Sequence, residues 1–243
     1  MAAAITLAPG LIHYPGWFDA EARIALASAL AEALGTAPPY TPRMPRTGKP
    51  FSVRMTNCGP LGWVSDRDGY RYQSNHPETG APWPPIPETA SRAWDALAHY
   101  VAPPEACLVN LYDPGARMGL HQDRDEDDIA APVVSLSLGA TALFRYGGLK
   151  RTDPTRSIRL ASGDALVMGG ASRLIHHGVD RLIDEPPQLF ADDHRAEDGR
   201  LGATLSRFLP TGGRCNLTLR RVTQPRDPAA RLTADGSGLT HRG

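Results

Sequence analysis

The chain has 243 residues, of which 41% are hydrophobic and 21% charged, and its 26 basic side chains balance 26 acidic ones. This composition is that of an ordinary globular protein, and the zero net charge excludes a chain that binds polyanions over its whole surface. Glycine (24) and proline (23) are abundant, which favours short strands and turns over a helical bundle. We expect one domain over residues 1–222 and a disordered tail over residues 223–243.

Neither the cysteines nor the apolar segments indicate secretion or a membrane. Cys58, Cys107 and Cys215 are odd in number and lack the spacing of a disulfide framework or a zinc motif. No segment approaches 18 consecutive apolar residues, and the first residues lack the basic region of a signal peptide. We therefore expect a cytoplasmic protein with reduced thiols and no membrane partner.

The first half of the chain predicts two helices separated by an irregular segment. Residues 19–34 predict a helix, because Asp19 can cap it, leucines recur on one stripe and Gly35 can end it. The next residues are rich in proline, and residues 51–87 mix short strand-like pieces with loops. Residues 87–101 predict a second helix with an apolar side.

The second half predicts strands. Short apolar segments separated by turn signals occur at residues 107–112, 132–138, 142–146, 157–160, 165–168, 173–179 and 214–222. A long polar insertion occupies residues 180–213. The whole pattern predicts a mainly β (α+β) domain with N-terminal helices, in which the strands form a sandwich or jelly roll.

Residues 40–75 carry six basic side chains against two acidic ones, with four aromatic residues between them: Phe51, Trp63, Tyr70 and Tyr72. Basic side chains bind phosphates and aromatic faces stack on bases, so this segment is a candidate nucleic-acid surface. A solvated charged face with a few buried aromatic residues explains the same pattern. The composition alone leaves both interpretations open.

A candidate metal site begins with His121 and Asp123, which point to the same side of an extended backbone. With His176 or His177 they would form the two-histidine, one-carboxylate set of non-haem iron(II) oxygenases. A His-x-Asp pair also arises by chance, and an exposed turn is the alternative. A calcium loop is a further alternative, but Asp128 stands where such a loop requires glycine.

The last predicted strand alternates between polar and apolar residues. The polar set is Arg214, Asn216, Thr218 and Arg220. An exposed strand shows the same alternation, but two guanidiniums that faced a barrel interior would need an anion, and a small dicarboxylate would satisfy both. Asn110 and Tyr112 share one face of an earlier strand and could complete the polar end of that pocket, although Tyr112 could equally be a core residue.

Several motifs, taken in order, resemble those of the AlkB family of DNA-repair dioxygenases. They are residues 110–125 (NLYDPGARMGLHQDRD), 135–139 (SLSLG), 144–151, 169–178 and 214–220 (RCNLTLR). Residues 55–63 and 69–70 resemble the nucleotide-recognition lid of the same family. The similarity extends from residue 51 to residue 222, and the metal motif is only one part of it.

The resemblance implies a double-stranded β-helix (jelly roll) over residues 106–222 and a nucleotide-recognition lid over residues 40–86. The implied iron ligands are His121, Asp123 and His177. The implied 2-oxoglutarate contacts are Asn110, Tyr112, Arg214, Asn216 and Arg220. Positions around a flipped base match Met55, Trp63, Tyr70, Asp125 and Arg151, and basic positions near the nucleic-acid backbone match Arg117 and Arg124.

The resemblance also implies an Fe(II)/2-oxoglutarate-dependent dioxygenase that demethylates N-alkylated bases in DNA, with RNA as a further candidate. Iron-oxo hydroxylation of the alkyl group would release formaldehyde, coupled to O2-dependent decarboxylation of 2-oxoglutarate to succinate. We expect a monomer that acts on alkylated single- or double-stranded DNA. The alternatives are a dioxygenase for a protein or small molecule and a non-enzymatic β-sandwich. The chain departs from the family at the insertion and at Met168, where an aromatic residue is expected.

Overall fold

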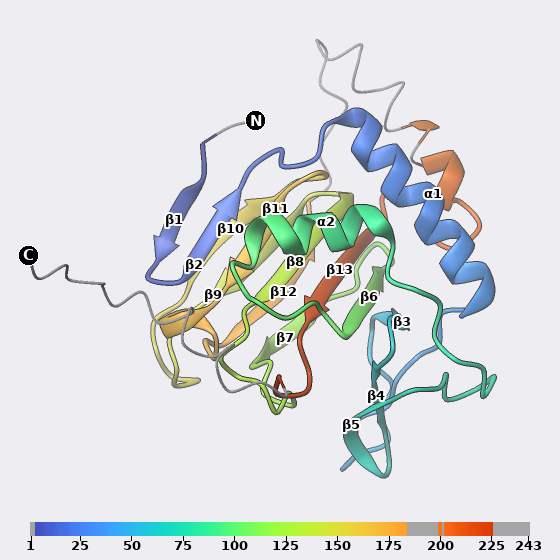
Figure 1. Ribbon diagram of the computed structural model, residues 1–243, viewed down its shortest axis with the longest axis horizontal. Helices are drawn as coiled ribbons and strands as arrows, with labels where there is room; N and C mark the ends of the chain where they lie inside the picture. Colours follow the sequence, from blue (N-terminus) through green and yellow to red (C-terminus); the bar gives the residue numbers. More distant parts are fainter. Residues whose placement is uncertain (1–2, 184–198, 201, 226–243) are drawn as a thin grey trace, which may run out of the picture.

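Two antiparallel sheets form the centre of the computed structural model, which describes residues 3–183, 199–200 and 202–225 (Figure 1). In spatial order, the larger sheet contains β1 (Ile5–Ala8), β2 (Leu11–Tyr14), β11 (Ala165–Met168), β8 (Val133–Gly139), β13 (Arg214–Arg220), β6 (Ala106–Tyr112) and β3 (Arg54–Cys58). The smaller sheet contains β10 (Arg156–Leu160), β9 (Ala142–Tyr146), β12 (His177–Leu182) and β7 (Met118–His121). Apolar residues of both sheets pack together between them, so the predicted jelly roll is confirmed.

The central strands of the larger sheet bury both of their faces. On β6, Val109 and Leu111 pack toward the helices, whereas Leu108 and Tyr112 pack toward the smaller sheet. Strand β13 pairs with β6 on one side and β8 on the other, and its Cys215, Leu217 and Leu219 join the cluster on the helical side. Because side chains alternate along a strand, the polar set of β13 faces the space between the sheets. The alternative of an exposed final strand is therefore wrong.

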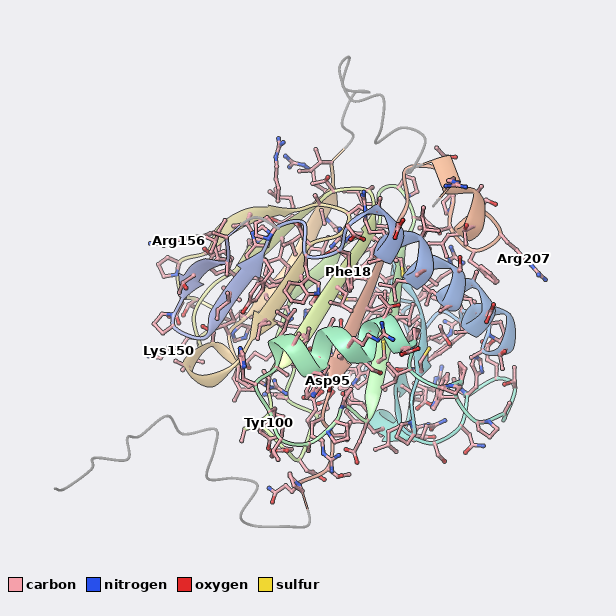
Figure 2. All side chains as sticks on the ribbon, turned by 45° about the horizontal axis from the view of Figure 1, so that its top comes forward. Phe18, Asp95, Tyr100, Lys150, Arg156 and Arg207 are labelled. Atoms are coloured by element: carbon pink, nitrogen blue, oxygen red, sulfur yellow. The ribbon has the colours of Figure 1, made fainter. Side chains whose placement is uncertain are left out.

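The helices α1 (Ala20–Thr36) and α2 (Glu88–Leu97) cover the outer face of the larger sheet (Figures 1 and 2). Asp19 caps α1 as predicted, since its side chain accepts a hydrogen bond of 2.9 Å from the backbone N–H of Ala22. However, α1 continues through Gly35, and α2 ends well before the predicted residue 101. His99 has a φ of 47°, a left-handed conformation that interrupts a helix. Among the described residues, no helix has the length and apolar character needed to cross a membrane.

The predicted strand over residues 173–179 is wrong in its first half. A short 3-10 helix, η1 (Gly170–Ser172), precedes an irregular segment, and β12 begins only at His177. The predicted insertion from residue 180 therefore starts inside β12. Residues 184–198, residue 201 and the tail beyond residue 225 lie outside the described residues. The described end of the insertion belongs to the core, because Leu205 and Leu209 are buried against the helical side of the larger sheet.

The sequence did not predict the hairpin of β1 and β2, which extends the larger sheet at β11. Both strands are only four residues long, so their periodicity is weak. Gly10 turns between them with a φ of 80°, and a Cβ atom there would lie 2.0 Å from the carbonyl oxygen of Gly169. Only glycine fits this turn.

Residues 62–73 form a separate hairpin of β4 (Gly62–Asp66) and β5 (Gly69–Gln73), beside β3 in Figure 1. Its attachment to the larger sheet depends on side chains. The amide of Asn57, on β3, donates to the carbonyl of Trp63 and accepts from its N–H, both at 3.0 Å. The indole of Trp83 donates to the carbonyl of Gln73 at 2.9 Å. The hairpin is thus held over the space between the two sheets.

Candidate functional site

A cavity of about 770 Å³ lies between the two sheets and the β4–β5 hairpin. Its walls include every residue that the sequence assigned to iron, to 2-oxoglutarate or to the base. Those on the sheets and their connecting loops are Asn110, Tyr112, Arg117, His121, Asp123, Arg124, Asp125, Arg151, His177, Arg214, Asn216 and Arg220. Those before the first jelly-roll strand are Met55, Trp63 and Tyr70. The fold thus brings distant parts of the chain to one site.

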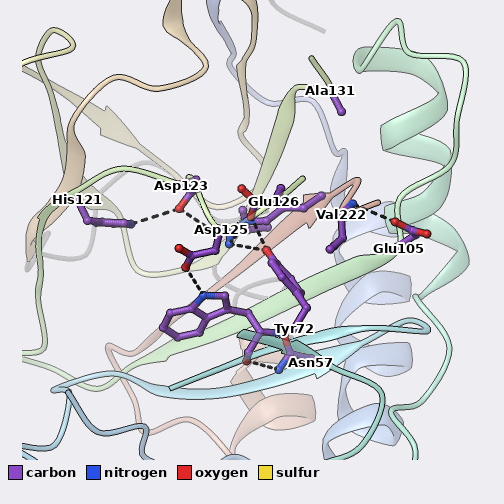
Figure 3. Close-up of polar contacts among 12 residues, drawn as sticks. Asn57, Tyr72, Glu105, His121, Asp123, Asp125, Glu126, Ala131 and Val222 are labelled. Atoms are coloured by element: carbon purple, nitrogen blue, oxygen red, sulfur yellow. Dashed lines mark hydrogen bonds and ion pairs between the residues drawn. The ribbon is translucent and has the colours of Figure 1, made fainter. Parts of the chain in front are cut away.

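Three potential metal ligands meet where β7 and β12 pair. His121 ends β7 and lies opposite His177, the first residue of β12, while Asp123 follows in the next loop. One ligand atom from each of the three residues lies within 4.8 Å of the other two. The Nε2 atoms of His121 and His177 are 3.6 and 3.8 Å from the Asp123 carboxylate, and Figure 3 shows the first of these contacts.

The outward nitrogen of each histidine fixes the direction of its ring. Nδ1 of His121 is 2.9 Å from the carbonyl oxygen of Gly119, and Nδ1 of His177 is 3.1 Å from that of Ile175. A hydrogen bond of this kind leaves Nε2 available as a metal ligand. His176 also lines the cavity, but it is not part of the three-residue group.

The protonation states of the group suit a divalent cation. Burial lowers the pKa of His177 to about 4, so the imidazole is neutral at pH 7. Burial alone would raise the pKa of Asp123, but Arg220 and the two histidines hold it well below its ordinary value. Two imidazoles and one carboxylate are the ligand set of non-haem iron(II) oxygenases, so the donor set fits iron(II).

The polar end of the cavity lies on β6 and β13, where Tyr112 is opposite Arg214 and Asn110 is opposite Asn216. Three buried atoms here have no hydrogen-bond partner among the described residues: Asn110 Oδ1, Arg214 Nε and Arg220 Nε. Because buried polar atoms are nearly always paired, these atoms indicate a ligand. Two guanidinium donors fit a dianion better than a neutral molecule.

Arg214 supports an anionic ligand most clearly. Its guanidinium is fully buried and donates to two backbone carbonyls, of Ala140 and Leu160, and to the hydroxyl of Ser137. All three acceptors are neutral. Burial lowers the pKa of Arg214 to about 10, which still leaves it charged at pH 7. A carboxylate in the cavity would compensate this charge.

The β4–β5 hairpin presents an aromatic face to the cavity. The rings of Trp63 and Tyr70 stack with centroids 5.5 Å apart and an interplanar angle of 17°. The indole N–H of Trp63 donates to the Asp125 carboxylate at 2.8 Å, as Figure 3 shows. Met55 is buried beneath them on β3, whereas Tyr70 is 52% exposed. Both aromatic residues therefore border the cavity, and the core interpretation is wrong for Tyr70.

The basic side chains of residues 40–75 and of the cavity rim divide into two groups. Arg71 makes two hydrogen bonds to Asp66, and Arg54 pairs with Asp113 at 2.7 Å, so these charges are compensated internally. The exposed basic residues without an ion pair to a described carboxylate are Arg43, Arg46, Lys49, Arg67, Arg117, Arg124 and Arg151. Arg117, Arg124 and Arg151 lie at the rim of the cavity, where a phosphate backbone could approach.

Sequence reasoning missed a buried set of charges next to the metal ligands. Glu126 pairs with Arg173 at 2.9 Å and with Arg220 at 3.2 Å, and it accepts a short hydrogen bond from Tyr72 (Figure 3). Arg173 also donates to the backbone carbonyl of Asp123 at 2.6 Å. Glu126 stands beside acidic residues that resemble an exposed turn, so its burial could not be read from the sequence. Arg173 belongs to a family-like motif, but its role was not predicted.

Comparison with known proteins agrees with this geometry. Residues 10–220 match the model of the 2OG-Fe(II) oxygenase superfamily. The chain is 48% identical to the alpha-ketoglutarate-dependent dioxygenase AlkB homolog of Caulobacter vibrioides, over 91% of this chain and 92% of that protein. It is 47% identical to the alpha-ketoglutarate-dependent dioxygenase AlkB of Escherichia coli (strain K12), over 59% of this chain and 68% of that protein.

A solved structure supports the same assignment. The structure of OsALKBH1 superposes with a TM-score of 0.68 at 30% sequence identity, covering 90% of this chain and 100% of that one. The ligand set, the partnerless atoms of the polar end and the extent of these matches are mutually consistent. The chain therefore belongs to the AlkB family of 2-oxoglutarate- and iron(II)-dependent dioxygenases.

Proposed function

We propose that this protein oxidatively demethylates N-alkylated bases in DNA, with RNA as a second candidate substrate. The observation that carries the proposal is that three features meet in one cavity: a two-histidine, one-carboxylate group, buried arginine nitrogens without a hydrogen-bond partner, and an aromatic hairpin. When bound, iron(II), 2-oxoglutarate and oxygen supply the oxidising power that hydroxylates the N-alkyl carbon, which then leaves as formaldehyde.

The three potential ligands have distinct tasks in this proposal. His121, Asp123 and His177 hold iron(II) and leave the remaining coordination positions for the co-substrates. The hydrogen bonds of the two imidazoles to backbone carbonyls orient their rings. The side chain of Arg220, 2.9 Å from the Asp123 carboxylate, fixes the orientation of that carboxylate. None of these residues needs to act as a nucleophile.

The polar set on β6 and β13 binds 2-oxoglutarate in this proposal. Arg214 and Arg220 supply guanidinium donors from opposite ends of β13, and Asn110, Asn216 and Tyr112 complete the wall between them. The partnerless Nε atoms of both arginines support this role. Because a carboxylate compensates the buried charge of Arg214, whose protein acceptors are all neutral, binding of 2-oxoglutarate also stabilises the folded protein.

The hairpin recognises the base. A target atom inside a duplex is out of reach, so the base must be flipped out or already single-stranded. Trp63 and Tyr70 offer flat surfaces for stacking, and Asp125 offers a carboxylate that can accept a hydrogen bond from the base. Arg117 and Arg124 bind the phosphates, Arg151 contacts the flipped base, and Met55 packs against the base from β3.

A nucleic-acid substrate is also consistent with the name of a more distant relative. The mouse protein named nucleic acid dioxygenase ALKBH1 is 32% identical over 52% of this chain, which covers 32% of that protein. A monomer in the cytoplasm, with residues 40–86 as the lid and 106–222 as the jelly roll, remains our prediction. The described residues of the lid and the jelly roll share one cavity, which supports treating residues 1–222 as one functional unit.

The test is product formation from a panel of methylated oligonucleotides, single- and double-stranded, DNA and RNA, with iron(II), 2-oxoglutarate and oxygen. With a methylated oligonucleotide, formaldehyde should appear together with at least an equal amount of succinate, and no formaldehyde should appear with its unmethylated counterpart. An Asp123→Asn variant should form neither product. Succinate without formaldehyde from every oligonucleotide would redirect the search to protein or small-molecule substrates.

A further inference from the structure

The β4–β5 hairpin reaches the proposed 2-oxoglutarate site through one side chain, Tyr72, that does not itself line the cavity. Tyr72 lies on β5, and its hydroxyl donates to Glu126 and accepts from Nη1 of Arg220 at 3.1 Å. Figure 3 shows this tyrosine beside Glu126, below the loop that carries Asp123 and Asp125. Tyr72 does not line the cavity, so contact with a base is not its task.

Glu126 is the centre of this contact. Its side chain is fully buried, and it pairs at once with Arg173 and Arg220, whose side chains are 3% and 7% exposed. With Asp123 the set contains two carboxylates and two guanidiniums, so its formal charges cancel inside the protein. Removing the charge of Glu126 would leave an uncompensated positive charge beside a cation site, which opposes metal binding.

The same carboxylate restricts the position of Arg220. Nη2 of Arg220 contacts Asp123, and Nη1 contacts Glu126 and the hydroxyl of Tyr72, so only Nε is left without a partner. A long arginine side chain loses much conformational freedom on binding a ligand unless it is already held in place. The contacts of Nη1 hold it before the co-substrate arrives.

We propose that Glu126 and Tyr72 are positioning residues that hold Arg220 for 2-oxoglutarate, so that the recognition hairpin contributes directly to co-substrate affinity. This inference rests on the proposed role of Arg220 in binding 2-oxoglutarate. It assigns to the hairpin a second task beside base recognition. Trp63 and Tyr70 serve the base, and Tyr72, on the same hairpin, serves the co-substrate.

The experiment measures the dissociation constant of 2-oxoglutarate for full-length protein loaded with manganese(II), without oxygen or oligonucleotide. Tyr72→Phe removes one hydroxyl and should raise this constant roughly three- to tenfold, less than the full effect of a hydrogen bond to a charged group because Glu126 remains. Glu126→Gln should raise it further and also weaken manganese binding. The double variant should match Glu126→Gln alone, because both residues act through Arg220.

Tyr40→Phe is the matched control, because Tyr40 is a second tyrosine of the predicted lid, and its hydroxyl bonds, among the described residues, only to the carbonyl of Trp63, at 3.4 Å. It should leave the 2-oxoglutarate constant unchanged. A lower melting temperature in Tyr72→Phe, with unchanged affinity per folded molecule, would show a merely structural role and overturn the inference. If Glu126→Gln fails to fold, Tyr72→Phe alone decides. Absence of 2-oxoglutarate binding by the unaltered protein would instead refute the proposed function.

Discussion

Replacing Arg214 by methionine tests whether the cavity is built around an anion. Burial of the charge lowers the pKa of Arg214 from its ordinary value to about 10, and one pKa unit corresponds to about 1.4 kcal/mol. The charged side chain is therefore destabilised by about 3 kcal/mol while no anion is present. Methionine removes that cost but leaves the acceptors of Ala140, Leu160 and Ser137 without a donor, at about 1 kcal/mol each. The two effects nearly cancel, so the variant should fold with nearly unchanged stability.

The effect on the co-substrate should be large. A carboxylate that compensates Arg214 recovers about 3 kcal/mol, which equals about 100-fold in affinity. At 100 times the dissociation constant, 2-oxoglutarate should stabilise the unaltered protein by about 2.7 kcal/mol, and at the same concentration it should stabilise Arg214→Met by only about 0.4 kcal/mol. For a chain of this size, the expected rise in melting temperature is about 5 to 10 °C against about 1 °C.

Thermal unfolding of the manganese(II)-loaded protein, with and without 2-oxoglutarate, provides the measurement. Arg145→Met is a suitable control, because Arg145 also has a buried Nε without a partner but pairs with Asp180 at 2.7 Å, outside the cavity. That variant should retain the full response to 2-oxoglutarate. If 2-oxoglutarate raises the melting temperature of Arg214→Met as much as that of the unaltered protein, a carboxylate of 2-oxoglutarate does not compensate the buried charge of Arg214.

Three further predictions concern other parts of the site and the fold. Trp63→Ala should weaken binding of methylated oligonucleotides about tenfold or more, since stacking contributes roughly 1–3 kcal/mol per base. Succinate formation in the absence of an oligonucleotide should persist. If oligonucleotide binding and this succinate formation are lost together, Trp63 has a packing role instead. His177→Ala should abolish manganese binding measured by calorimetry, whereas His176→Ala should retain it; the reverse result would change the ligand assignment. Asp164 is buried beside His13, 2.9 Å away. Burial alone would raise the pKa of the Asp164 carboxyl. The hydrogen bonds from His13 and two backbone N–H groups lower this pKa by more than burial raises it, so the pKa lies below the ordinary value of 3.8. The ionised Asp164 carboxylate therefore stabilises the folded protein above pH 3.8, and this stabilisation is lost as the pH falls below 3.8. Asp164→Asn should lower the melting temperature at pH 7 and much less at pH 3.

The strands of the jelly-roll core could be predicted because their burial leaves a clear signal. β9 and β11 match the expected ranges residue for residue, and β13 differs only at its end. The alternation on β13 also placed Arg214 and Arg220 on one face. The alternation alone could not decide whether the polar face or the apolar face of β13 turns inward, because the pattern is the same in both cases. That decision needed either the family resemblance or the structure.

The elements and residues that the sequence did not predict share one physical cause: local sequence patterns carry no information about long-range contacts. The β1–β2 hairpin is too short for a periodic signal and forms because β11 offers an edge. Arg173 lies in a segment that is apolar enough for a strand, but its side chain turns inward to Glu126 and to the Asp123 carbonyl and interrupts the regular backbone. Glu126 itself is buried only because two arginines from distant segments meet it.

The attachment of the β4–β5 hairpin has a consequence for how the enzyme could diversify. The hairpin is held by side-chain contacts that include the amide of Asn57, the indole of Trp83, the hydroxyl of Tyr72 and the hydrogen bond from Trp63 to Asp125, without a continuous backbone ladder to the larger sheet. A hairpin from another family member that preserves these contacts could therefore replace this one without altering the strand register of the jelly roll. New lesion preferences could arise by exchanging a dozen residues, while the oxidative centre is inherited unchanged.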